Sequence, residues 1–161
     1  AAGTFAALVG TSLNGLGIPV YKYKSTDTSV NTTTTLASDA DIAGFALTVS
    51  KLYRIRGYLG MTTTGGTCGF KVGLKWTNAP NGGYITSTFN STRNDSTSPT
   101  ATTTLSDSGA LNFAGGISIE GWFQANTTTA GTLDLVWTQS SSSATPLYLK
   151  NGSWLEITQL N

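Results

Sequence analysis

Hydrophobic and polar residues alternate along most of the chain with a period of two, which is typical of half-buried β-strands. The clearest example is segment 70–76, in which large apolar residues alternate with Lys and Gly. The same alternation predicts strands at 20–24, 42–50, 52–62, 84–90, 111–124, 131–139 and 154–160, and a Thr-rich strand at 30–36. No capped amphipathic helix is evident. The pattern therefore predicts an all-β protein.

Turn residues separate these segments. Gly65-Gly66, Asn81-Gly82-Gly83 and Asn151-Gly152 are predicted turns, because Gly and Asn accept positive φ at little cost. Segment 91–108 is rich in Ser, Thr, Asn and Asp, which predicts a long exposed loop with a short edge strand at 102–105. About eight to ten strands at this spacing favour a single antiparallel β-sandwich or jelly roll over residues 20–161.

The first 19 residues do not share this pattern. They contain apolar residues, among them Phe5, Leu8, Val9 and Leu13, but Gly interrupts them and neither a strand nor a helix period is sustained. Two interpretations fit: an irregular first strand folded back on its own domain, or an extended N-terminal arm that docks on a partner. We expect the arm, with the domain boundary after residue 19.

Charge and composition exclude several classes of function. Charged residues make up 11% of the chain against roughly 25% in typical soluble domains, and the net charge is +1. No basic stripe suited to nucleic acid is present, and no apolar run reaches the roughly 18 residues of a membrane-spanning helix. The chain has no His, the commonest general base and metal ligand. The sequence therefore predicts a non-enzymatic protein without cofactor, metal, nucleic-acid or membrane partner.

The remaining candidate groups have simpler interpretations. Glu120, Asp134 and Glu156 lie within predicted strands at positions opposite the apolar ones, which favours solvated or interface carboxylates over a catalytic pair. Asp39-x-Asp41 could hold Ca²⁺, but two acids without a longer acidic loop more often form a turn. Cys68 begins an alternating strand, which favours a small buried side chain over a reactive thiol.

The four tryptophans divide by strand parity. Trp76 and Trp137 take the apolar parity and are predicted core residues, whereas Trp122 and Trp154 take the polar parity. An outward aromatic residue can contact another subunit or stack on a sugar ring, and we favour the subunit contact. The predicted interface combines the apolar arm with charged and aromatic residues of the polar parity: Phe5, Leu8, Val9, Leu13, Arg54, Arg56, Tyr58, Glu120, Trp122 and Trp154.

The C-terminal third carries a family resemblance. A strand ending in Trp-x-Gln is followed by a small-polar loop, a short apolar strand and a closing Gly-Ser-Trp-Leu-Glu-Ile strand. This order resembles jelly-roll virion proteins of tailed bacteriophages. The matching residues are Leu133, Leu135, Trp137, Gln139, Leu147, Leu149, Gly152, Ser153, Trp154, Leu155, Glu156 and Ile157.

The resemblance implies a jelly-roll structural protein of the virion and supplies no catalytic residue. Together with the composition, it leads us to expect a capsid decoration (cement) protein on the outer surface of the phage head. Such a protein would assemble as a homotrimer and contact neighbouring major capsid protein subunits. The alternative is a receptor- or carbohydrate-binding jelly-roll domain of a tail fibre or spike, with a glycan as partner.

Overall fold

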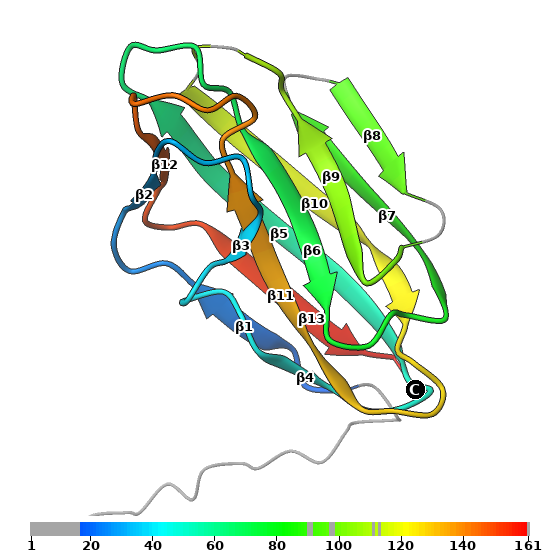
Figure 1. Ribbon diagram of the computed structural model, residues 1–161. Coiled ribbons are helices and arrows are strands. Elements are labelled where there is room, and N and C mark those ends of the chain that lie inside the picture. The colour runs from blue at the N-terminus through cyan, green and yellow to red at the C-terminus, as the bar shows by residue number, and fades with distance from the viewer. Residues whose placement is uncertain (1–16, 90–91, 97–98, 111, 113, 161) are drawn as a thin grey trace, which may run out of the picture.

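The computed structural model describes residues 17–89, 92–96, 99–110, 112 and 114–160. Every regular element within them is a strand, and the strands form two antiparallel sheets that pack against each other (Figure 1). The predicted all-β class and the sandwich arrangement are therefore confirmed. The described residues contain no helix with the length and apolar character needed to cross a membrane.

The larger sheet, called the large sheet below, has eight strands. Six follow the order β1-β13-β5-β10-β7-β8, and β12 pairs with both β5 and β2. Their bounds are β1 Val20–Tyr23, β2 Thr28–Val30, β5 Leu52–Thr63, β7 Gly82–Phe89, β8 Thr92–Ser96, β10 Ala114–Gln124, β12 Leu147–Leu149 and β13 Trp154–Gln159. The long strands β5 and β10 therefore form the centre of this sheet.

The small sheet has five strands in the order β3-β11-β6-β9, and β4 also pairs with β11. Their bounds are β3 Ala37–Ser38, β4 Phe45–Leu47, β6 Lys71–Trp76, β9 Thr102–Asp107 and β11 Gly131–Thr138. Strand β11 is central because β3 and β4 pair with successive parts of one of its edges.

The core lies between the sheets and consists of the apolar-parity residues of both. Trp76 of the small sheet meets Phe123 of the large sheet edge to face, with ring centroids 5.6 Å apart. Tyr53 stacks on the same Phe123 ring at 5.4 Å. Trp76 and Trp137 are 1% and 3% exposed, which confirms their predicted core position, and Cys68 is fully buried as predicted.

The strand predicted at 30–36 is wrong. Strand β2 ends at Val30, and the chain is irregular until β3 begins at Ala37. Thr32 has a positive φ of 53°, and its N–H donates to the Ser143 carbonyl, while the Thr33 carbonyl accepts from the Thr138 hydroxyl. The backbone of this Thr run therefore bonds to a loop and a side chain, so strand propensity alone misled the prediction.

The long loop predicted at 91–108 is wrong in part, because 92–96 forms strand β8, which pairs with β7. The edge strand predicted at 102–105 is confirmed as β9, which runs on to Asp107 and pairs with β6. Both are terminal strands of their sheets. In β9, hydroxyl side chains suit a pleat that faces solvent. Leu105 of β9 is buried and Thr104 is exposed, so a single large apolar side chain anchors this strand to the core.

Thirteen strands are described where eight to ten were expected, and the additional ones include the short strands β2 and β3, of three and two residues, and β8 within the predicted loop. The bend at Asn151-Gly152 has the predicted positive φ, 77° at Gly152. Most of the predicted arm, including Phe5, Leu8, Val9 and Leu13, lies outside the described residues. Within its described part, the Gly17 N–H donates to the Gln159 carbonyl at the end of β13.

Candidate functional site

The outer face of the large sheet gathers the aromatic and charged residues that the core excludes. Alternate residues of β5, β10 and β13 point away from the core, and the antiparallel register places them opposite one another. We call this surface the outer face. It comprises Tyr21, Tyr23, Arg54, Arg56, Tyr58, Glu120, Trp122, Trp154 and Glu156.

One row across the outer face is aromatic. The register pairs Tyr23 of β1 with Trp154 of β13, and Trp154 with Tyr58 of β5. Tyr21 lies with its ring centroid 5.6 Å from that of Trp154 and 5.9 Å from that of Tyr23. Tyr21, Tyr23 and Tyr58 are 52%, 58% and 45% exposed, so flat apolar surface faces solvent on β1 and β5, on either side of β13.

The neighbouring row is charged. Arg56 lies between Glu156 of β13 and Glu120 of β10 in the register. Its Nη2 is 3.1 Å from Glu156 Oε1, and Nη2 of Arg54 is 3.8 Å from the same oxygen. Both arginine side chains remain more than 40% exposed, so this ion pair contributes little to folding and leaves donors for a partner.

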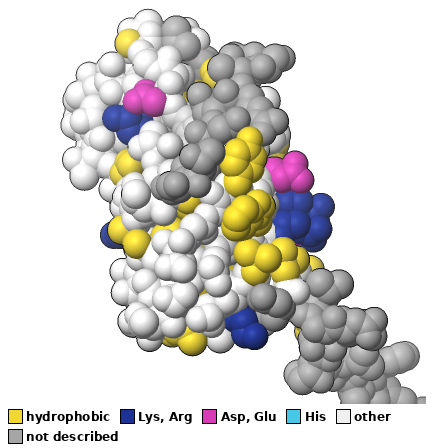
Figure 2. Space-filling model, turned by 90° about the vertical axis from the view of Figure 1, so that its right-hand side faces the viewer, with side chains coloured by type: hydrophobic (Ala, Val, Ile, Leu, Met, Phe, Trp, Pro, Cys, Tyr) yellow, Lys and Arg dark blue, Asp and Glu magenta, His cyan; other side chains and the backbone are white. Residues whose placement is uncertain are grey.

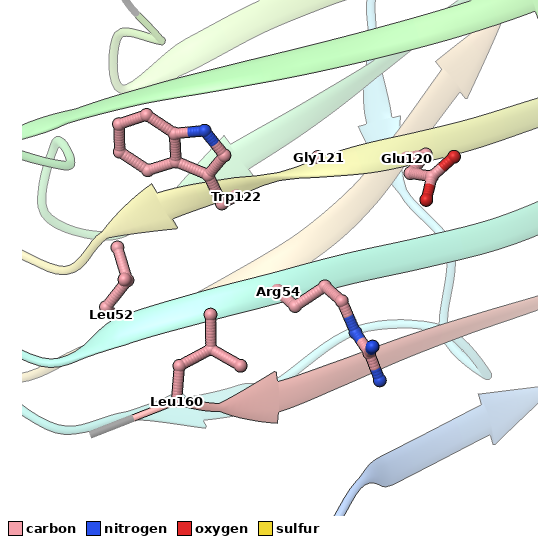
Figure 3. A pocket seen from close by; sticks show the side chains of 6 residues that line it. All are labelled: Leu52, Arg54, Glu120, Gly121, Trp122 and Leu160. Atoms are coloured by element: carbon pink, nitrogen blue, oxygen red, sulfur yellow. The ribbon is translucent and has the colours of Figure 1, made fainter. Parts of the chain in front are cut away.

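A hollow lies at the end of the outer face toward the C terminus. Its volume is about 510 Å³, and Leu52, Arg54, Glu120, Gly121, Trp122 and Leu160 line it. Trp122 extends from β10 on one side, Arg54 and Leu52 come from β5, and Leu160 follows β13 (Figure 3). Trp122 is 46% exposed. The hollow thus combines an apolar wall with one cation and one carboxylate.

The space-filling view shows how hydrophobic and charged side chains are distributed over one side of the molecule (Figure 2). Exposed hydrophobic side chains form a band beside a small group of basic and acidic ones, while most of the remaining described surface in this view is uncharged (Figure 2). The described residues contain no group of three or more His, Cys, Asp or Glu side chains that could hold a metal ion. At the outer face, the aromatic rings can stack on a partner and the arginines can donate bidentate hydrogen bonds to it.

The outer face joins six of the residues predicted from sequence: Arg54, Arg56, Tyr58, Glu120, Trp122 and Trp154. The sequence prediction missed Tyr21, Tyr23 and Glu156 as members of the same surface. The alternation at 20–24 already gave the two tyrosines a common parity. Only the pairing of β1 with β13 reveals that they lie beside Trp154.

A second polar cluster lies between the edges of the two sheets. Lys24 follows β1, Asp39 follows β3, and both side chains are only 1% exposed. Nζ of Lys24 lies 3.0 Å from Asp39 Oδ2 and 2.9 Å from Asp41 Oδ2. Burial lowers the pKa of Lys24, but the hydrogen bonds and negative charges of Asp41 and Asp39 outweigh it, so the net pKa is raised.

Asp39 is also the turn former that the Asp39-x-Asp41 pattern favoured. Its Oδ1 accepts from the N–H groups of Asp41 and Ile42 at 3.1 and 3.2 Å. Its Oδ2 accepts from Trp137 Nε1 at 3.2 Å. The carboxylate oxygens that might have held Ca²⁺ are engaged by a lysine, an indole and two backbone donors.

The residues behind the family resemblance organise the fold. The amide of buried Gln139 donates to the Thr145 carbonyl at 2.7 Å and accepts from the Ser143 N–H at 3.1 Å, which shapes the loop before β12. Buried Ser153 accepts from the Gly60 N–H at 3.0 Å and so ties the start of β13 to β5. Two polar residues of the motif, Gln139 and Ser153, are therefore explained by hydrogen bonds that hold the fold together.

No protein-family model, curated protein or solved structure matches this chain.

Proposed function

We propose that this protein is a non-enzymatic structural subunit of a tailed-phage particle, a jelly-roll capsid decoration protein on the outer surface of the head. It acts as a homotrimer that contacts major capsid protein subunits. The virion assignment rests on the resemblance of strands β11, β12 and β13 to phage jelly-roll proteins. The assembly assignment rests on the outer face.

The observation that carries the proposal is the exposure of large aromatic side chains beside half-exposed arginines on one sheet face. Tyr23, Tyr58 and Trp122 are between 45% and 58% exposed, on three different strands. Tyr, Trp and Arg are the residue types that dominate protein interfaces, because each buries a large area and keeps a polar group to pair. Contact with a second copy would desolvate the aromatic rings and give the arginines further acceptors.

A glycan is the second candidate partner, favoured by the row of Tyr21, Tyr23, Trp154 and Tyr58. Adjacent aromatic rings on neighbouring strands offer stacking surface for sugar rings. The hollow beside Trp122 would supply Arg54 and Glu120 as hydrogen-bonding groups. Under this reading the protein is a receptor-binding domain of a tail fibre or spike.

The test compares assembly and glycan binding in one set of variants. Light scattering of the unmodified protein at micromolar concentration should give a trimer. Trp122→Ala and Arg56→Ala should each raise the dissociation constant about 30-fold or more, since an interface hot spot is worth at least about 2 kcal/mol. Thr104→Ala, on an exposed site of β9, should change nothing and serves as the matched control.

A monodisperse monomer would contradict the trimer, and glycan-array binding by that monomer would establish the second candidate. The number of copies in purified particles of the source virus distinguishes a location on the head from one in the tail. Decoration requires many copies per particle, whereas a tail fibre or spike requires few. A protein absent from purified particles would contradict both.

A further inference from the structure

We propose that Lys24 and Asp39 condense to form an intramolecular isopeptide (amide) bond, with Asp41 transferring the protons. This activity is independent of the outer face and of the virion assignment. It is inferred from the arrangement of one amine and two carboxyl groups between the sheet edges, where only the exposed Asp41 side chain has substantial contact with solvent.

The reacting groups are already in contact. Nζ of Lys24 lies 3.2 Å from Oδ1 and 3.0 Å from Oδ2 of Asp39, so the amine is held against both carboxyl oxygens. Holding the two groups together replaces a bimolecular encounter, and a small rotation of either side chain would bring Nζ over the carboxyl carbon. Both side chains are 1% exposed, so water has little access to the reacting pair.

The contacts of Asp39 divide its two oxygens into different roles. Oδ1 accepts from the N–H groups of Asp41 and Ile42, which are placed to stabilise the negative charge that develops on this oxygen in a tetrahedral intermediate. Oδ2 accepts from Trp137 Nε1 and is the oxygen that leaves. The two backbone donors belong to the turn itself, so they are oriented before any reaction begins.

Asp41 supplies the proton path. Its Oδ2 lies 2.9 Å from Lys24 Nζ, within reach of the ammonium protons. Two protons leave the lysine nitrogen and are passed by Asp41 to Oδ2 of Asp39. The Nζ–Cγ bond forms, the Cγ–Oδ2 bond breaks, and Oδ2 departs with both protons as water. No oxidant or reductant takes part, and Asp41 ends unchanged.

A cavity of about 340 Å³ adjoins the cluster and is lined by Lys24, Asp39, Asp41 and Trp137, among others. It gives the released water a place to go, and one of its lining residues, Asp41, has a side chain that is 41% exposed. The bond would join the end of β1 in the large sheet to the end of β3 in the small sheet. It would fasten the two layers of the sandwich covalently at this edge.

Mass spectrometry of the unfolded full-length chain tests the proposal directly. We expect a chain lighter by one water molecule than its sequence requires, and a protease digest that contains a branched peptide joining Lys24 to Asp39. An unchanged mass after prolonged incubation of the folded protein at neutral pH, with linear peptides at both positions, would overturn it.

Three variants separate the bond from other dehydrations, such as imide formation at an Asp residue elsewhere. Lys24→Arg and Asp39→Ala should abolish the mass loss, whereas an imide elsewhere would persist in both. Asp41→Asn keeps the amine and the target carboxyl and should slow condensation by about 10² to 10⁴-fold, the usual contribution of a positioned acid–base group. Condensation at the unmodified rate in Asp41→Asn would overturn the role of Asp41.

An internal control is already present in the chain. Lys150 contacts Asp27 at the surface, and both side chains are more than a third exposed. This pair has an amine and a carboxylate in contact, but it lacks the enclosure. The same digest should therefore show Lys150 and Asp27 in linear peptides, and a branched peptide there would show that mere contact suffices.

Discussion

Strand β5 presents two faces with opposite properties. On the inner face, Tyr53, Ile55 and Leu59 are between 0% and 4% exposed and pack against the small sheet. On the outer face, Arg54, Arg56 and Tyr58 occupy the positions between them and are more than 40% exposed. One backbone and one register thus hold both sets at the same spacing.

The difference shows what each face is built to do. The inner residues already have their partners, because apolar side chains from both sheets surround them. The outer residues carry large aromatic and guanidinium groups whose exposed area contributes little to folding. Substitutions at the two faces should therefore separate stability from association.

The largest effect should come from Trp137, a buried tryptophan of strand β11 in the small sheet. Trp137→Ala should lower the free energy of unfolding by about 3 to 5 kcal/mol, because it removes a buried aromatic ring and the indole donor to Asp39. Trp122→Ala, at a 46% exposed position, should leave that free energy within about 1 kcal/mol of the unmodified value. Urea denaturation of dissociated protein measures both changes, and equal losses would contradict the division between the faces.

The same contrast applies to the two lysine–aspartate contacts. Relative to the chain in which Lys24 and Asp39 have not yet condensed, Lys24→Met should cost about 3 to 5 kcal/mol, because it leaves the Asp39 carboxylate buried without its cation. Lys150→Met, at the exposed contact with Asp27, should barely change stability. Thermal unfolding of the two variants side by side tests this, and an unaffected Lys24→Met protein would show that Asp39 is held well enough by its backbone and indole donors.

Much of this architecture could be predicted from sequence, because one-sided burial imposes an alternation that can be read directly. The alternation in β5, β6, β10 and β13 assigned inner and outer residues correctly before any pairing was known. Short strands such as β3, with two residues, carry no period to read. Polar edge strands such as β8 resemble loops, because few apolar residues mark them.

The outer face and the Lys24–Asp39 cluster depend on which strands pair and in which register, and neither can be inferred from the alternation of residues. Lys22 and Lys24 share a parity opposite the two tyrosines of β1, and such lysines would ordinarily face solvent. Instead the tyrosines are exposed, Lys24 is buried against Asp39, and Lys22 lies over the Phe45 ring and donates to the Ala43 carbonyl. Strand β1 can turn its lysines inward because carboxylates, a carbonyl and an aromatic ring from the small-sheet side receive them.

The smallest predicted effect is a pH dependence at the exposed contact. The hydrogen bond from Lys150, with a second from the Asn151 N–H at 2.8 Å, lowers the pKa of Asp27 below its ordinary value. Because the folded state prefers the ionised carboxyl, this contribution is present above the unfolded pKa of about 3.9 and is lost as pH falls through the folded pKa.

Asp27→Asn removes this charge and keeps an oxygen acceptor for Asn151. The variant should be slightly less stable than the unmodified protein near neutral pH. The difference should close below both pKa values, and it should also shrink in about 1 M salt, where screening shortens to about 3 Å. Urea midpoints measured across this pH range at low and high salt follow both trends. A difference that persists in strong acid, where Asp27 is uncharged, would show that the effect does not come from the ionised carboxyl, whereas one that widens there would reverse the sign of the linkage.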